Sequence, residues 1–155
     1  MSKRFVILHN IRSAHNVGSV FRTSDGAGVA KIFLTGYTPA PKDRFGRVHT
    51  EIAKTSLGAV ETVPYEQVDD VVALIARLKN EGVQVVAVEQ TERAVEYRAF
   101  EIQGDTAFIF GNEVTGVETE VLDACDAHIE IPMSGIKESL NVSVCVGVIL
   151  FAFRQ

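Results

Sequence analysis

The sequence lacks any long apolar run. Among its 155 residues no stretch of about 18 consecutive apolar residues occurs, so we expect no membrane-spanning helix and no membrane partner. The start of the chain also lacks the apolar region of a secretory signal peptide, because only Phe5–Leu8 follow the charged pair Lys3 and Arg4. Together these absences predict a cytoplasmic protein.

Cysteine is scarce, and neither the cysteines nor His15 have the spacing of metal ligands. Cys125 and Cys145 lie in apolar surroundings without the spacing of metal ligands, so we expect two reduced core residues. His15 has no second ligand at a suitable spacing, and we expect no metal. Internal repeats, low-complexity tracts and domain linkers are absent as well. The hydrophobic content of 46% is typical of a globular chain, so the sequence predicts one domain over residues 1–155.

The chain has no overall excess of positive charge, since its net charge is −5. The distribution is nevertheless uneven. Residues 1–60 hold nine Lys or Arg and three Asp or Glu, whereas the remainder holds six and seventeen. A basic N-terminal part on an acidic body is typical of a one-sided polyanion-binding face, but a solvated charge pattern without a partner explains it equally well.

What the sequence does contain is an alternation of short apolar runs with helical patterns. Apolar runs on nearly every strand are expected when helices cover both faces of a parallel sheet. The pattern therefore predicts an α/β fold with a mostly parallel sheet and helices on both faces. The expected strands are Phe5–Leu8, Lys31–Thr35, Val60–Val63, Val83–Val88, Ala107–Phe110 and His128–Ile131. The expected helices are Val17–Ala27, Val68–Asn80, Glu118–Ala124 and Leu140–Arg154, the last of them apolar almost all round.

Three polar segments interrupt this pattern. The first, Asn10–Arg22, opens a helix in which Asn16 is a possible cap, and the close approach of a ligand or another backbone would explain Gly18 in its first turn. The second, Gly111–Gly116, follows a buried strand, at the sheet edge where open α/β proteins bind ligands. In the third, Ile131–Val144, Ser139 is the expected cap of the last helix, while Asn141 needs a polar partner.

Taken together, the three segments resemble the TrmH-like branch of the SPOUT, or α/β-knot, RNA ribose 2′-O-methyltransferases. The matching residues are Asn16-Val17-Gly18-Ser19-Val20-Phe21-Arg22, Phe110-Gly111-Asn112-Glu113 with Gly116, and Ile131-Pro132-Met133 with Ser139-Leu140-Asn141-Val142-Ser143. They occur in family order and span nearly the whole chain. The resemblance implies a C-terminal trefoil knot, a homodimer, and the transfer of a methyl group from S-adenosylmethionine to a ribose 2′-hydroxyl of tRNA or rRNA.

The resemblance also assigns residues to the site. The implied catalytic group is Arg22, Asn16, Glu113, Ser139 and Asn141. The implied cofactor-binding residues are Val88, Glu89, Gly111, Asn112, Ile131, Met133, Ser139 and Leu140. Arginine side chains stay protonated in proteins, so Arg22 would grip the phosphate next to the 2′-hydroxyl, unless that phosphate helps it to take the proton as the family proposals hold. Glu113 would orient Asn112 or Arg22.

The long loop from Gly36 to Thr50 is the expected RNA contact, because loops of this length inside a domain are often functional. Phosphate contacts are expected from this loop and from the approach to the site. The expected substrate-binding residues are Arg12, His15, Lys42, Arg44 and Arg47, with His49 as a further candidate on the loop.

The sequence leaves two other classes of protein to consider. A non-catalytic knotted dimer that binds RNA or cofactor would share the same residues. A Rossmann-type nucleotide enzyme is disfavoured, because Leu8-His9-Asn10-Ile11-Arg12 stands where its glycine fingerprint would follow the first strand. Because the first strand starts at about Arg4, we expect no N-terminal RNA-binding extension, which slightly favours tRNA over rRNA.

Overall fold

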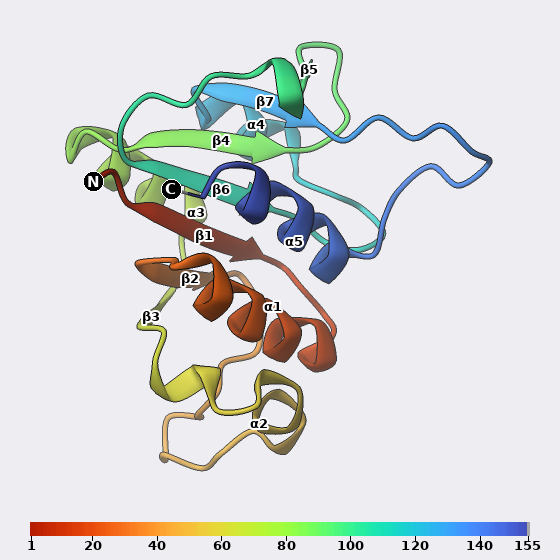
Figure 1. Ribbon diagram of the computed structural model, residues 1–155. Coiled ribbons are helices and arrows are strands. Elements are labelled where there is room, and N and C mark those ends of the chain that lie inside the picture. Colours follow the sequence, from red (N-terminus) through yellow and green to blue (C-terminus); the bar gives the residue numbers. More distant parts are fainter. Residues whose placement is uncertain (155) are drawn as a thin grey trace.

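The computed structural model describes residues 1–154 and places the strands of this part in one seven-stranded sheet in which all paired strands run parallel. The strand order is β3-β2-β1-β6-β4-β7-β5, with β1 and β6 in the middle (Figure 1). The strands are β1 (Arg4–His9), β2 (Lys31–Thr35), β3 (Tyr65–Val68), β4 (Gln84–Val88), β5 (Val95–Glu96), β6 (Thr106–Phe110) and β7 (Ala127–Glu130).

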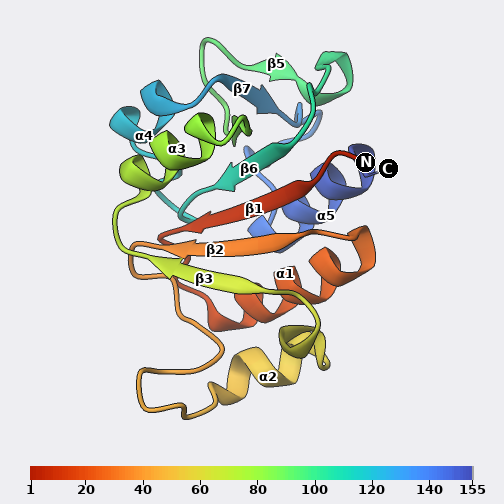
Figure 2. The ribbon, with the colours of Figure 1, turned by 90° about the vertical axis from the view of Figure 1, so that its left-hand side faces the viewer.

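Helices cover both faces of this sheet. Figures 1 and 2 show α1 and α5 together on one face and α3 and α4 on the other, while α2 lies beyond α1. The helices are α1 (Ala14–Ala27), α2 (Thr50–Ser56), α3 (Val71–Asn80), α4 (Thr119–Ala124) and α5 (Val142–Ala152), with short 3-10 turns η1 (Ala59–Glu61) and η2 (Tyr97–Ala99). The predicted α/β class with a mostly parallel sheet is confirmed. The knot stays a prediction.

The alternation of side chains along the central strands divides the core into two clusters. Phe108 of β6 packs on the face covered by α1 and α5, whereas its neighbour Ile109 packs on the face covered by α3 and α4. Both side chains are fully buried, and burying one such side chain contributes about 1.5–3 kcal/mol to the free energy of folding. Two buried faces explain why these strands show as continuous apolar runs in the sequence.

The expected strand Val60–Val63 is wrong. Residues Ala59–Glu61 form the turn η1 after Gly58, whose φ of 89° is left-handed, and the strand follows at Tyr65–Val68. This strand, β3, is an edge strand that pairs only with β2, and none of its residues is fully buried. An edge strand needs no continuous apolar run, which is why the pattern pointed to the wrong segment.

The helix starts also differ from expectation: α1 begins at Ala14 rather than Val17, and α5 begins at Val142 rather than Leu140. Helix α3 begins at Val71 rather than Val68, because the Asp70 side chain accepts a hydrogen bond from the backbone N–H of Ala73 at 3.0 Å and caps the helix. Helix α2 was not expected at all, since its seven residues follow directly on the long loop. None of the helices in residues 1–154 is long and apolar enough to cross a membrane.

Candidate functional site

The site begins where three neighbouring strands end. β4 lies between β6 and β7 in the sheet, and the three run in the same direction. Their carboxyl ends therefore meet at one edge, and the loops that follow them, residues 89–94, 111–118 and 131–141, come together there. Open α/β sheets bind ligands at such an edge.

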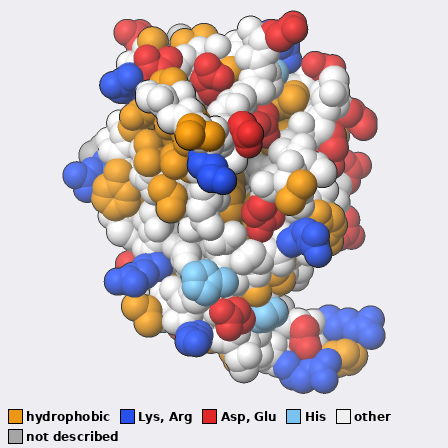
Figure 3. All heavy atoms as spheres, turned by 90° about the vertical axis from the view of Figure 1, so that its right-hand side faces the viewer, with side chains coloured by type: hydrophobic (Ala, Val, Ile, Leu, Met, Phe, Trp, Pro, Cys, Tyr) orange, Lys and Arg blue, Asp and Glu red, His pale blue; other side chains and the backbone are white. Residues whose placement is uncertain are grey.

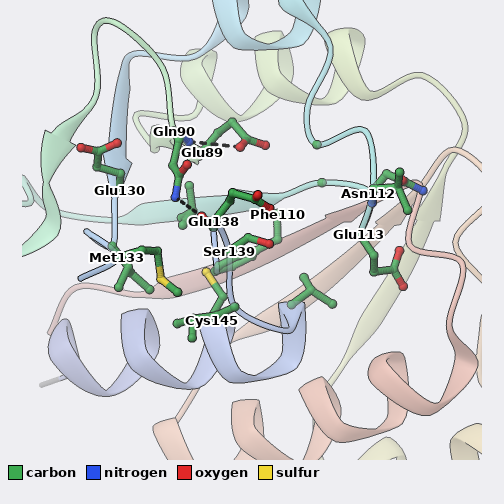
Figure 4. Close-up of a pocket in the computed structure, with 17 residues that line it drawn as sticks. Glu89, Gln90, Phe110, Asn112, Glu113, Glu130, Met133, Glu138, Ser139 and Cys145 are labelled. Carbon is green, nitrogen blue, oxygen red and sulfur yellow. Dashed lines mark hydrogen bonds between the residues drawn. The ribbon is translucent and has the colours of Figure 1, made fainter. Parts of the chain in front are cut away.

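These loops and the first turns of α5 enclose a pocket of about 310 Å³, which is within the size range of small-molecule sites. Figure 4 shows Met133 projecting from the loop after β7 and Cys145 from α5 into the same space. All eight residues expected to bind the cofactor line this pocket: Val88, Glu89, Gly111, Asn112, Ile131, Met133, Ser139 and Leu140. Their roles as ligand contacts stay a prediction.

The wall formed by residues 111–117 depends on two glycines. Asn112 and Gly116 exchange backbone hydrogen bonds of 3.1 and 2.9 Å, and the Asn112 Oδ1 accepts from the backbone N–H of Val114 and Thr115. A Cβ on Gly111 would lie 2.5 Å from the carbonyl carbon of Gly116, and Gly116 itself has a left-handed φ of 69°. Only glycine at both positions lets the loop close this tightly.

Glu89 and Gln90 brace the pocket from the end of β4. One Glu89 carboxylate oxygen accepts from the backbone N–H of Val117 at 3.1 Å, and the other accepts from that of Gln90 at the same distance. The Gln90 side-chain amide donates to the backbone carbonyl of Glu138 at 2.7 Å (Figure 4). This pair therefore ties the loop after β6 to the loop after β7.

The charges around the pocket have one sign. Four glutamates, Glu89, Glu113, Glu130 and Glu138, belong to its lining, whereas no Lys, Arg or His does. Apolar side chains such as Phe110 and Ile131 make up much of the remainder. An acidic, partly apolar pocket favours a ligand with net positive charge and an apolar body, and it disfavours a ligand that carries phosphate groups.

Glu113 connects the pocket to the start of α1. Its carboxylate accepts hydrogen bonds from the backbone N–H groups of Arg12 and Ser13, both at 3.1 Å, and from the Asn16 side chain at 3.4 Å. Burial raises the pKa of Glu113, but these hydrogen bonds outweigh burial and lower it below its ordinary value. Within residues 1–154 Glu113 makes no hydrogen bond to the Asn112 or Arg22 side chain; it holds the first turn of α1 and, with it, Asn16. Its orienting role toward Asn112 or Arg22 stays a prediction.

In both α1 and α5, the N-cap is a residue close in sequence to the one expected. Ser13, not Asn16, caps α1, since its hydroxyl accepts from the Asn16 backbone N–H at 3.1 Å. Asn141, not Ser139, caps α5, since its Oδ1 accepts from the Ser143 backbone N–H at 2.9 Å and from the Ser143 hydroxyl at 2.6 Å. Asn141 and Ser143 therefore supply each other's polar partner, and Ser139 is an exposed residue of the pocket rim.

The structure does not bring Arg22 to the pocket of its own chain. Arg22 is an exposed residue in the middle of α1, and it makes neither a hydrogen bond nor an ion pair within residues 1–154. Gly18, one turn earlier, serves packing and no ligand: a Cβ there would lie 1.7 Å from the Thr55 hydroxyl and 2.7 Å from the Ile52 carbonyl oxygen of α2. Of the two reasons expected for Gly18, the approach of another backbone is confirmed.

The residues expected to contact RNA lie in two groups. Arg12 and His15 are exposed at the start of α1, beside Glu113. Lys42, Arg44 and Arg47 are exposed on the loop after β2, whereas His49 is half-buried at the start of α2. Their contacts with RNA stay predictions.

Several pocket residues have no signal in the sequence pattern. Cys145 and Val142 look like ordinary core positions of an apolar helix, yet both line the pocket. Tyr37 was also missed, although its hydroxyl lies 2.7 Å from the Asn112 amide nitrogen and links the long loop to the pocket wall. Within the described part of the chain no group of three or more His, Cys, Asp or Glu could hold a metal ion.

Fold and pocket together define an α/β protein with an acidic, small-molecule-sized pocket at the carboxyl ends of parallel strands. Residues 3–151 match the SpoU rRNA Methylase family, and because this match covers nearly the whole chain, the protein belongs to that family.

Individual relatives agree with this assignment. The 23S rRNA (guanosine-2′-O-)-methyltransferase RlmB of Ralstonia nicotianae is 37% identical over 151 residues, which are 97% of this chain and 58% of the relative. A crystal structure of an AdoMet-bound rRNA methyltransferase from Sinorhizobium meliloti superimposes with a TM-score of 0.86 at 28% identity, covering 98% of this chain and 56% of that one. The TrmH/SpoU tRNA modifying enzyme of A. aeolicus gives a TM-score of 0.84 at 30% identity, covering 98% and 74%. The chain thus spans little more than half the length of the curated relatives it matches.

Proposed function

We propose that this protein transfers a methyl group from S-adenosylmethionine to a ribose 2′-hydroxyl of RNA. The observation that carries the proposal is the acidic pocket at the ends of β4, β6 and β7, in a chain of the SpoU rRNA Methylase family. A relative named for guanosine-2′-O-methylation and a similar structure described as AdoMet-bound support the same activity.

The pocket fits S-adenosylmethionine in charge and in size. The sulfonium and the ammonium group of this molecule outnumber its single carboxylate, so its net charge is positive and matches a pocket whose charged lining residues are all glutamates. The apolar walls from Phe110, Ile131 and Leu140 suit an adenine ring, and the exposed backbone of residues 111–116 offers hydrogen bonds. When bound, the cofactor supplies a methyl group on a sulfonium, which is already a strong electrophile.

The protein then has to align the 2′-hydroxyl and to allow the removal of its proton. Arg22 binds the adjacent phosphate and holds the hydroxyl in line, since a guanidinium matches a phosphate bidentately. The proton that the 2′-hydroxyl loses passes to solvent water. Glu113 and Asn16 position the start of α1, the helix that carries Arg22.

Because Arg22 does not line the pocket of its own chain, it acts in the pocket of a second copy. The outer side of α5 supports this arrangement. Val146 and Ile149 face the core with no exposure, but Val144 and Phe151 of the same helix are 51% and 43% exposed. On the left side of Figure 3, where α5 lies, hydrophobic side chains gather on the surface. A homodimer that covers this side of α5 places the neighbouring helix α1, with Arg22, at the partner's pocket.

The substrate is RNA, either rRNA or tRNA. Supporting this class are the basic residues of the long loop and relatives that are named for rRNA or tRNA. A cytoplasmic location and the trefoil knot complete the proposal.

The test is methyl transfer from radiolabelled S-adenosylmethionine to bulk tRNA and, separately, to rRNA, followed by digestion to nucleosides and mass mapping. We expect a 2′-O-methylated nucleoside from one of the two RNA pools and its loss in Arg22→Ala. Calorimetry of cofactor binding distinguishes the failures. Cofactor binding without transfer to either RNA would contradict tRNA and rRNA as substrates and leave either another substrate or a non-catalytic dimer. No cofactor binding at all would contradict the assignment of the pocket.

A further inference from the structure

The tip of the long loop, residues 42–48, is a hairpin held by its own hydrogen bonds. Lys42 and Val48 form an antiparallel bridge, and inside it the Asp43 backbone N–H donates to the Arg47 carbonyl at 3.0 Å. The Asp43 carboxylate accepts from the backbone N–H of Phe45 at 2.8 Å and from the backbone N–H and the Nε of Arg47 at 3.0 and 2.7 Å. Gly46, with a left-handed φ of 77°, closes the turn. The hairpin is therefore fixed before any partner arrives.

This fixed turn presents an aromatic ring to solvent. Phe45 is 66% exposed, and the guanidinium groups of Arg44 and Arg47 lie 4.7 and 5.1 Å from its ring centroid. The hairpin protrudes from the body of the molecule, as the loop beside α2 in Figure 2 and the arm at the lower right of Figure 3 show. Phe45 belongs to neither core cluster, so core packing does not explain an aromatic residue here.

An exposed phenyl ring with two guanidinium groups beside it suits one kind of partner. Unpaired nucleobases stack on aromatic rings and on arginine planes, while arginine and lysine bind the phosphates beside them. The bases of a duplex are already stacked on each other and leave no free face for Phe45. A second copy of the chain fits less well, because a stable interface buries about 800 Å² on each side. One aromatic side chain at a convex tip supplies only about 150–250 Å².

We infer that the hairpin stacks an unpaired base of the RNA substrate on Phe45, with Arg44 and Arg47 on the flanking phosphates. The inference rests on the proposed RNA methyltransferase function and narrows its substrate class to RNA with an unpaired nucleotide, such as a loop or bulge, beside the methylated site. Asp43 is a positioning residue in this arrangement, because both of its carboxylate oxygens serve the turn.

The experiment measures binding of two RNAs of equal length without cofactor. One is a stem-loop with a single unpaired 2-aminopurine in the loop, and the other is fully paired. We expect Phe45→Ala to weaken stem-loop binding roughly 5- to 150-fold, to abolish the quenching of 2-aminopurine, and to leave duplex binding and the salt dependence unchanged. Phe45→Trp should retain both stem-loop signals. Arg44→Ala should instead lower the slope of affinity against salt by about 1.

Leu57→Ala is the matched control, because Leu57 is 67% exposed and lies outside the hairpin. Stem-loop binding by Phe45→Ala equal to that of Leu57→Ala would overturn the inference, as would equal losses on both RNAs. A change in sedimentation without a change in RNA affinity would also overturn it and assign the hairpin to a subunit contact. Phe45-dependent stacking in a protein that transfers no methyl group would contradict the proposed function alone.

Discussion

Among single residues, two glycines of α1 should respond in opposite ways to replacement by alanine, because only one of them lies against another backbone. Replacing glycine by alanine inside a helix usually stabilises it by up to about 1 kcal/mol. Gly26 has room, since a Cβ there would lie 3.6 Å from the Phe151 ring, an ordinary contact. Gly18 has none, because the same atom would meet the backbone of α2 at 2.7 Å.

We therefore expect opposite signs from Gly18→Ala and Gly26→Ala in urea unfolding. Gly18→Ala should lower the free energy of unfolding by about 1–3 kcal/mol, because α2 has to move away from α1. Gly26→Ala should leave it unchanged or raise it by up to about 1 kcal/mol. A stabilising Gly18→Ala would show that α2 does not pack where the structure places it.

Cys145 allows a second prediction for a single residue. Burial and, after it, the negative charge of Glu89 raise the pKa of the Cys145 thiol from 9.0 to about 12. Burial raises the pKa of Cys125 to about 12 as well. Because the thiolate is the reactive form, a rise of this size lowers alkylation at pH 8 roughly a thousandfold.

Iodoacetamide at pH 8 should accordingly leave both cysteines of the folded protein unmodified over a period in which the urea-unfolded chain reacts fully. Mass spectrometry of the peptides around the two positions measures this difference. Rapid modification of Cys145 in the folded protein would mean that the pocket wall is open to solvent and less acidic than described.

Residue-level features set the limit of what sequence alone predicts. The eight residues that the family resemblance assigned to the cofactor do line one pocket. The apolar strands alone indicated only the edge of the sheet at which a ligand would bind. The exchange of caps at Ser13 and Asn141 was not readable, since Ser, Asn and Asp all make good caps and only the backbone path selects among them. The partner of Glu113 depends on contacts across about 100 residues of chain, which no local pattern encodes.

At the scale of the element, the buried strands were predictable and the edge strands were not. β1, β4 and β6 are buried on both faces and appear as apolar runs, whereas β3 and β5 lie at the two edges of the sheet. Edge strand β3 is joined to its neighbours by ion pairs as well as by its pairing with β2. The Glu66 carboxylate lies 2.9 Å from the Lys31 amine of β2 and 3.0 Å from the Arg77 guanidinium of α3.

These contacts predict how stability depends on pH. Hydrogen bonds from Arg77 and then Lys31 lower the pKa of Glu66 from 4.5 to about 2. A carboxylate with a depressed pKa in the folded state stabilises the protein above pH 4.5, and this contribution is lost as the pH falls toward 2. The melting temperature of Glu66→Gln should therefore lie below that of the wild type at pH 7, with the gap closing between pH 4.5 and pH 2.

Differential scanning calorimetry of both proteins at several pH values measures this gap. Glu61→Gln serves as the control, since Glu61 is an exposed acid outside the ion pairs found in residues 1–154. A gap that stays constant down to pH 2 would show that the Glu66 contacts do not hold β3 in solution.

In the molecule as a whole, the pocket and Arg22 form one active site only if two copies of the chain associate. A single chain holds the acidic pocket at one end of β4, β6 and β7, and Arg22 on the exposed part of α1 outside it. The apolar outer side of α5 supplies the surface that a second copy would cover. No sequence pattern could place these parts, because their relation depends on the assembly of two folded chains.

Two inactive variants, combined in one dimer, test whether Arg22 acts in the pocket of a second copy. Arg22→Ala removes the phosphate grip, and Ser139→Arg places a bulky positive charge at the rim of the pocket, where a cationic cofactor has to enter. Each variant alone should transfer no methyl group to RNA. After the two are mixed, unfolded and refolded together, half of the dimers are mixed, and each mixed dimer has one intact pocket facing one intact Arg22. We expect about a quarter of wild-type methyl transfer from the mixture, and no recovery of activity would show that Arg22 does not act in the pocket of a second copy.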